Sequence, residues 1–152
     1  NATTVDTIRD LKNREPFAPF TIVMNSGDRY LIEDADALAI AIYKGSKDFP
    51  RDESFGVRSQ LPRADVSIPS NIVEGSARRG EREYVNFLNV ARGSAAELHY
   101  LLGLSGKLGY LLPAVTDSLK GATDKVAAQL QAMLNELDVR RVQSQEPKAR
   151  RL

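Results

Sequence analysis

Apolar side chains recur at helical spacing over most of the chain. Four stretches show the i, i+3, i+4, i+7 pattern of an amphipathic helix, at residues 34–49, 54–78, 81–108 and 115–137. Their predicted buried stripes are, in chain order, Leu38, Ala41, Ile42 and Lys44–Gly45; Val57, Leu61, Ala64, Ile68, Ile72 and Gly75; Tyr84, Phe87, Leu88, Ala91, Ala95, Leu98, Leu101, Leu102 and Leu108; and Val115, Leu119, Ala122, Val126, Leu130, Met133 and Leu137. Long amphipathic helices with short connections predict an all-α, up-down-up-down four-helix bundle.

The pattern is different before Asp34, which is the predicted N-cap of the first long helix. Residues 4–14 predict a short helix, and the residues that follow alternate apolar and polar side chains. A turn-like Asn-Ser-Gly-Asp segment and a second apolar run make 17–32 a predicted β-hairpin. A lone hairpin is marginal in water, so this one is expected to pack on a neighbour. The expected organisation is a helix-and-hairpin appendage at 1–31, the bundle at 32–138 and a basic flexible tail at 139–152.

The helix predicted at 54–78 carries a second, polar stripe beside its apolar one. Four polar residues lie at i, i+4, i+7 and i+11, so they share one face, and two of them, Glu74 and Arg78, can form an i, i+4 ion pair. Pro69 removes a helical hydrogen bond and predicts a kink, and Gly75 allows another backbone to approach. One interpretation is that these residues face solvent beside the kink. The other is a contact between subunits, completed by two residues of the next helix. The predicted interface consists of Ser67, Pro69, Asn71, Glu74, Gly75, Arg78, Arg92 and Glu97.

Charge is balanced overall and uneven locally. The formal net charge is +1, but residues 139–152 alone carry five basic residues and one glutamate. This segment is either a frayed, solvated C-terminus or an arm that binds phosphates. A second basic cluster falls at the link between the second and third helices, where it either pairs with nearby glutamates or contacts phosphates. The candidate nucleic-acid-binding residues are Arg78, Arg79, Arg82, Arg140, Arg141, Lys148, Arg150 and Arg151.

Composition bounds the class of protein. The chain has no cysteine, which excludes disulfides and thiolate metal sites. It contains no apolar run of membrane-spanning length, and its first residues lack the apolar stretch of a signal peptide. These features favour a cytoplasmic protein that does not enter a membrane.

The sequence offers little for catalysis. It has one histidine, His99, whereas a di-iron bundle needs a Glu-x-x-His motif on each of two helices. It has no phosphate-binding loop and no nucleophile-elbow motif. We therefore expect no enzymatic activity, no metal, no cofactor and no small-molecule substrate.

A family resemblance covers about half of the chain. The segments "IYKGSKDFPRDESFGVRSQ", "VSIPSNIVEG" and "EYVNFLNVARGSAAEL", followed by "LGY", resemble the motifs of the 23S ribosomal RNA intervening-sequence family. The chain departs from that pattern at Pro62, Asp65 and Val73, where the family has a polar helix former, a small apolar residue and an alanine.

The resemblance implies a left-handed four-helix bundle assembled into a ring, with a pentamer as the expected size, and no catalytic activity. Some members are encoded within 23S ribosomal RNA genes, and accessory proteins of diversity-generating retroelements are similar in fold. The alternative function is therefore an accessory protein that contacts RNA phosphates through its basic residues. Upstream, "REPFAPFTIVMNSGDRYLIEDADALAI", which runs into the first long helix, resembles a small, uncharacterised β-rich bacterial family and implies no activity.

Overall fold

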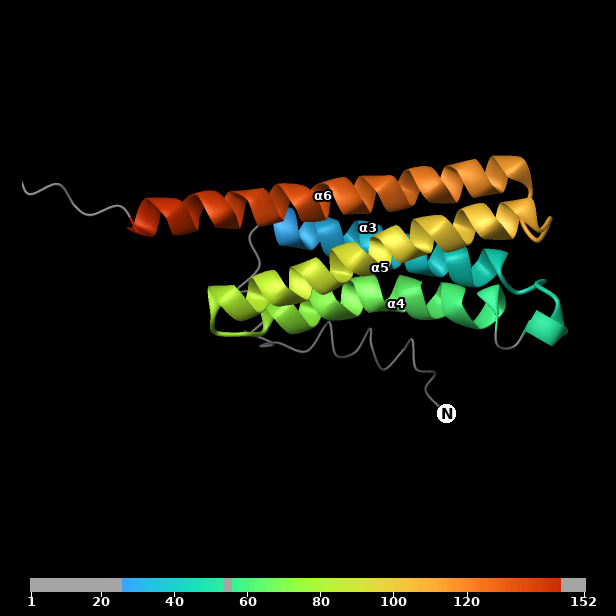
Figure 1. Ribbon diagram of the computed structural model, residues 1–152, viewed down its shortest axis with the longest axis horizontal. Coiled ribbons are helices and arrows are strands. Elements are labelled where there is room, and N and C mark those ends of the chain that lie inside the picture. The colour runs from blue at the N-terminus through green and yellow to red at the C-terminus, as the bar shows by residue number, and fades with distance from the viewer. Residues whose placement is uncertain (1–25, 54–55, 146–152) are drawn as a thin grey trace, which may run out of the picture.

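The described part of the protein is entirely helical. A computed structural model describes residues 26–53 and 56–145 (Figure 1). Its elements, in chain order, are the helices and one short 3₁₀ turn α3 (Ser26–Gly45), η1 (Arg51–Glu53), α4 (Val57–Ser76), α5 (Glu81–Lys107) and α6 (Pro113–Gln145). No strand occurs within these ranges, so the four long helices define the fold.

The four helices lie side by side as a bundle (Figure 1). α4 packs most extensively on α5, and α5 packs on α6. α3 closes the arrangement, because it contacts both α4 and α6. α4 and α6 share almost no contacts and therefore lie on opposite sides of the bundle.

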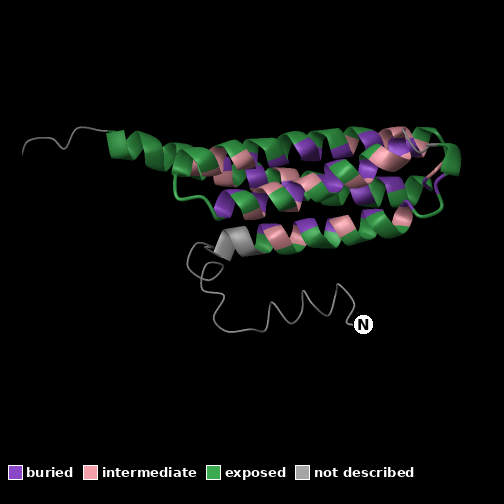
Figure 2. Ribbon diagram, turned by 90° about the horizontal axis from the view of Figure 1, so that it is seen from below, coloured by how far each residue is buried: buried purple, intermediate pink, exposed green. Residues whose placement is uncertain are grey.

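The apolar stripes predicted from the sequence form the core. All six residues predicted for α4, from Val57 to Gly75, are buried. Most central residues of the α5 and α6 stripes are buried as well, and Figure 2 shows buried positions along the inner faces of the helices. The predictions fail at the turn between α5 and α6, where Leu108 is 48% exposed and Val115 is 38% exposed. They also fail inside two stripes, because Ala41 and Lys44 on α3 and Ala122 on α6 are exposed.

The turn between α5 and α6 has a specific backbone geometry. Gly109 has φ of +76°, the left-handed conformation that glycine adopts without strain. Its N–H donates to the Gly106 carbonyl, and the N–H of Tyr110 donates to the Ser105 carbonyl. This pattern is the Schellman motif, which satisfies the last carbonyls of a helix. Pro113 then occupies the first position of α6, where its missing N–H costs nothing.

The β-hairpin prediction is wrong where the structure can test it. Residues 29–33, expected as the second strand, belong to α3, which begins at Ser26 rather than at Asp34. Leu31, Ala35, Leu38 and Ile42 lie at i, i+4, i+7 and i+11 and are all buried, so a helical stripe replaces the short alternation. The predicted helix at 4–14 and the first strand of the hairpin lie outside the described residues.

α6 extends further than its predicted stripe. The sequence placed residues 139–152 in a basic flexible tail, but α6 continues to Gln145. Arg140 and Arg141 are therefore helical. Lys148, Arg150 and Arg151 lie outside the described residues.

Candidate subunit interface and basic surface

The polar stripe of α4 lies beside α5. The hydroxyl oxygens of Ser67 on α4 and Ser94 on α5 are 2.8 Å apart and share a hydrogen bond. The Asn71 amide donates to the Ser67 carbonyl at 2.7 Å and lies 3.1 Å from the Ser67 hydroxyl. These groups therefore find partners within one chain, which the sequence could not show.

An open hollow lies between the two helices at this level. It has a volume of about 420 Å³ and is lined by Gln60, Arg63, Ala64, Ser67, Ser94 and Glu97. We call it the α4–α5 hollow. The side chains of Arg63 and Glu97 carry opposite charges, and neither has a hydrogen bond or ion pair with another described residue. The Ser67 and Ser94 hydroxyls form one polar wall of the hollow. They hydrogen-bond to each other, so this wall needs no partner from outside the chain.

Gly75 permits a close approach within the chain. A Cβ atom added there would lie 2.7 Å from the Phe87 Cβ and 3.0 Å from Tyr84 Cδ2. The absence of a side chain at Gly75 thus lets α5 approach α4. We expected Gly75 to admit the backbone of a neighbouring subunit, but in the structure α5 of the same chain occupies this position.

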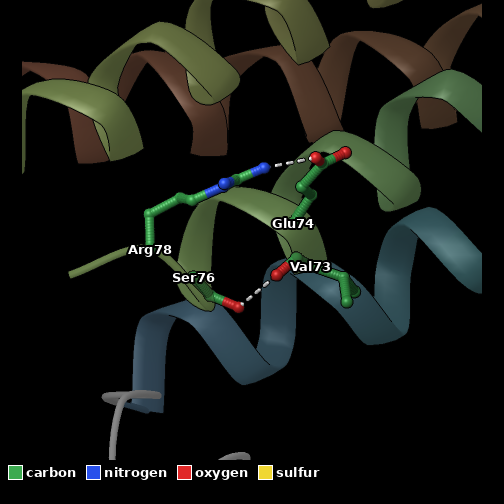
Figure 3. Close-up of polar contacts among 4 residues, drawn as sticks. All are labelled: Val73, Glu74, Ser76 and Arg78. Atoms are coloured by element: carbon green, nitrogen blue, oxygen red, sulfur yellow. Dashed lines mark hydrogen bonds and ion pairs between the residues drawn. The ribbon is translucent and has the colours of Figure 1, made fainter. Parts of the chain in front are cut away.

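Glu74 and Arg78 form the expected i, i+4 ion pair. Their side chains meet at 2.7 Å and both stay largely exposed (Figure 3). The Arg78 guanidinium also lies 5.1 Å from the centre of the Phe87 ring, so it ties the end of α4 to α5. The Ser76 hydroxyl donates to the Val73 carbonyl at 2.7 Å in the same turn.

Arg92 does not join this group. Its guanidinium donates to the Gln131 side chain on α6 at 2.8 Å. His99 also faces α6, where its ring nitrogen lies 2.7 Å from an oxygen of Asp124. The structure therefore places Glu97 beside the α4–α5 hollow and Arg92 on the α6 side of α5.

A second hollow brings together arginines that are distant in the sequence. Its volume is about 230 Å³, and it lies where the end of α4, the start of α5 and the last turns of α6 meet. Arg78, Arg79 and Arg140 line it, together with Glu81 and Glu136. Arg78 pairs with Glu74, and Arg140 pairs with Glu136, which leaves Arg79 without an ion pair to a described residue. Arg82 and Arg141 do not line this hollow.

Sequence reasoning missed the most unusual polar group in the core. Asp65 on α4 is 2% exposed, and its Oδ1 atom has no hydrogen-bond partner among the residues that the structure describes. Burial raises the pKa of its carboxyl to about 7. The signals in the sequence are a charged residue within a buried stretch, next to Ala64, and the departure from the family's small apolar residue at this position.

The described residues show no group of metal ligands and no helix suited to a bilayer. No three acidic or histidine side chains among them gather as a metal site. Each helix that the structure describes is too short or too polar to cross a membrane.

Comparisons with known proteins agree with this architecture. The sequence model of the family described as 23S rRNA-intervening sequence protein matches residues 29–132. Solved structures also match, among them a protein of unknown function from the S23 ribosomal protein family of Bacteroides thetaiotaomicron. That protein is 22% identical, with a TM-score of 0.67 over 72% of this chain and 98% of its own length, so it supports the fold. None of the curated proteins compared with the chain matches it.

Proposed function

Since the chain belongs to the 23S rRNA-intervening sequence protein family, we propose that it is a non-catalytic module that assembles with copies of itself. The assembly is a closed ring of identical left-handed, up-down-up-down bundles, with five subunits as the expected number. In a ring of this kind, one surface of each subunit binds a different surface of the next subunit.

The observation that carries the proposal is the α4–α5 hollow. It holds an arginine and a glutamate that no described residue pairs, beside a wall of paired hydroxyls. A partner that supplies the opposite charges would find the hydroxyl wall already satisfied, so its docking would leave few polar groups unpaired.

The outer faces of the bundle support the same conclusion. Tyr43 on α3, Val66 on α4 and Tyr100 on α5 are 65%, 54% and 67% exposed. Tyrosine is enriched at protein interfaces, where its ring is buried and its hydroxyl keeps a polar contact. These side chains are candidates for burial in the assembly.

Sedimentation velocity over a concentration series tests the proposal. We expect one species with a mass several times the 16.7 kDa of a single chain, and native mass spectrometry should give its subunit number. A protein that sediments as a monomer at tens of micromolar contradicts the proposal.

The alternative function is contact with RNA phosphates, and one observation favours it. The second hollow places Arg79, which has no ion pair to a described residue, beside Arg78 and Arg140. Such a site would bind the backbone without reading bases, so its affinity should fall steeply with salt.

Filter binding of a single-stranded RNA at two salt concentrations tests this alternative. Arg79→Gln should weaken binding and lower the slope of log K against log salt by about one. Arg51→Gln, in the exposed η1 segment and outside this hollow, is the control and should change neither. No binding at low salt excludes the alternative.

A further inference from the structure

The C-terminal end of α6 has no partner helix among those that the structure describes. Residues 138–145, which we call the overhang, are exposed throughout. Figure 1 shows this end of α6 projecting past the ends of the other helices. Helices in proteins derive most of their stability from packing, and apart from Arg140, which lines the second hollow, the overhang receives little packing from the other described helices.

One face of the overhang carries two opposite charges and an apolar side chain. Asp138, Arg141 and Val142 lie at i, i+3 and i+4 and so share that face. Val142 is 63% exposed. The charged side chains of Asp138 and Arg141 have no hydrogen bond or ion pair with any residue in the described ranges.

The α4–α5 hollow offers the complementary set. Arg63 on α4 and Glu97 on α5 present the opposite charges from two different helices. Gly93 lies four residues before Glu97 and so shares its face of α5, and nothing lies within 4 Å of the position where a Cβ of Gly93 would stand, which leaves space beside Glu97 for a side chain such as Val142. The charges therefore match between two surfaces of one molecule.

We propose that the overhang of one copy fills the α4–α5 hollow of the next copy, with Asp138 against Arg63 and Arg141 against Glu97. The proposal rests on the proposed ring assembly and names the surfaces that build it. Both pairs join charges of opposite sign, and such pairs fix the register of a contact and reject other partners.

The dimensions and positions of the two surfaces agree with this contact. The α4 wall of the hollow, from Gln60 to Ser67, and the overhang each span eight helical residues, so at 1.5 Å per residue both are about 10.5 Å long. The overhang belongs to α6, on the opposite side of the bundle from α4. A chain with the inserting surface on one side and the receiving surface on the other builds a head-to-tail contact, the kind of contact from which a closed ring is made when the rotation between neighbouring copies closes.

Charge reversal and its rescue test the proposal in the full chain. Glu97→Arg alone and Arg141→Glu alone should each raise the dissociation constant of the assembly at least about tenfold, because each places like charges together. The double variant restores opposite charges and should return to within about threefold of the wild type. Arg63→Glu and Asp138→Arg should behave in the same way, alone and together.

Arg51→Glu is the control for a general charge effect. Arg51 is exposed in η1 and takes part in neither surface, so its reversal should leave the assembly unchanged. All four reversed positions are exposed, and circular dichroism should show wild-type helix content for each variant.

The outcomes separate this inference from the proposed function. A wild-type protein that assembles while the single reversals assemble equally well overturns the inference and leaves the ring in place. Reversals that weaken assembly without rescue in the double variant also overturn it. A wild-type monomer overturns both, and an Arg141→Glu variant that loses RNA binding at unchanged mass assigns Arg141 to the alternative function.

Discussion

Asp65 sets a pH dependence on the stability of the fold. An ionised carboxylate loses its hydration when buried, and no charged neighbour offsets that loss at Asp65, since burial is the cause of its raised pKa. The folded-state pKa of about 7 lies above the usual 3.8, so the folded protein binds this proton more tightly than the unfolded chain. The tighter binding of this proton adds to the free energy of unfolding. That addition is fully present below pH 3.8 and is lost as pH rises towards 7.

Asp65→Asn should remove this dependence. The variant cannot ionise, so its free energy of unfolding should exceed that of the wild type by an amount that grows as pH rises from 4 to 7, at most about 1.4 kcal/mol per pH unit. Urea denaturation at pH 5, 6, 7 and 8, at one protein concentration, measures the difference. Asp52→Asn, at an exposed residue of η1, is the control and should show no such trend. Parallel stability curves for Asp65→Asn and wild type would contradict the prediction.

Gly75 is the second residue whose packing restricts the amino acid at its position. Its missing side chain lets Phe87 and Tyr84 approach α4, and a methyl group would overlap the Phe87 Cβ. Gly75→Ala should lower the free energy of unfolding by about 1–3 kcal/mol, because α5 must shift to make room.

Gly121→Ala is the matched control for Gly75. Gly121 is an exposed residue of α6 with open space at the Cβ position, so alanine there should raise stability by about 0.5–1 kcal/mol through helix propensity alone. Chemical denaturation compares the two variants. Equal changes in the free energy of unfolding at the two positions would show that α5 does not pack closely against Gly75.

Among the helices, α4 conflicts most with local propensity. It runs without a break from Val57 to Ser76 through Pro62 and Pro69. Each proline lacks the N–H that would bond the carbonyl four residues earlier, at Arg58 and Asp65. Burial of one whole face against α3 and α5 offsets this loss, which is why the helix persists.

Pro62→Ala should stabilise the protein. Alanine restores one hydrogen bond and the intrinsic preference for helix, so we expect the free energy of unfolding to rise by about 1–3 kcal/mol. Pro50→Ala, in the link before η1, removes a proline outside any helix and should not raise stability. Denaturation midpoints that move equally in the two variants would contradict the expectation.

At the scale of the whole molecule, the core that the described residues show is formed by the four helices and their links. The buried apolar residues of the described ranges begin at Leu31 and end at Leu134. A chain without residues 1–25 should therefore keep the helix content and cooperative unfolding of the bundle, as measured by circular dichroism. Removal of residues 1–36 should strongly lower the free energy of unfolding of the bundle, because it deletes the core residues Leu31 and Ala35. Unfolding of the shorter deletion would show that the first 25 residues complete the core.

The sequence by itself determined the helices of α4, α5 and α6 and the centres of their buried faces. Periodicity at 3.6 residues is a local property that survives any rearrangement of neighbours, so the stripe from Val57 to Gly75 could be predicted residue by residue. The sequence also predicted the i, i+4 pair of Glu74 and Arg78, since that spacing alone brings two side chains together on a helix.

Only the tertiary structure decided what those faces meet. The start of α3 depended on Leu31 finding a core, which overrode a short alternating pattern that otherwise favours a strand. The hydrogen bond of Ser67 to Ser94, the approach of Phe87 to Gly75 and the separation of Arg92 from Glu97 all depend on how α4, α5 and α6 are rotated against one another. Rotation about a helix axis is set by the packing of side chains from different parts of the chain, and spacing within one helix does not contain it.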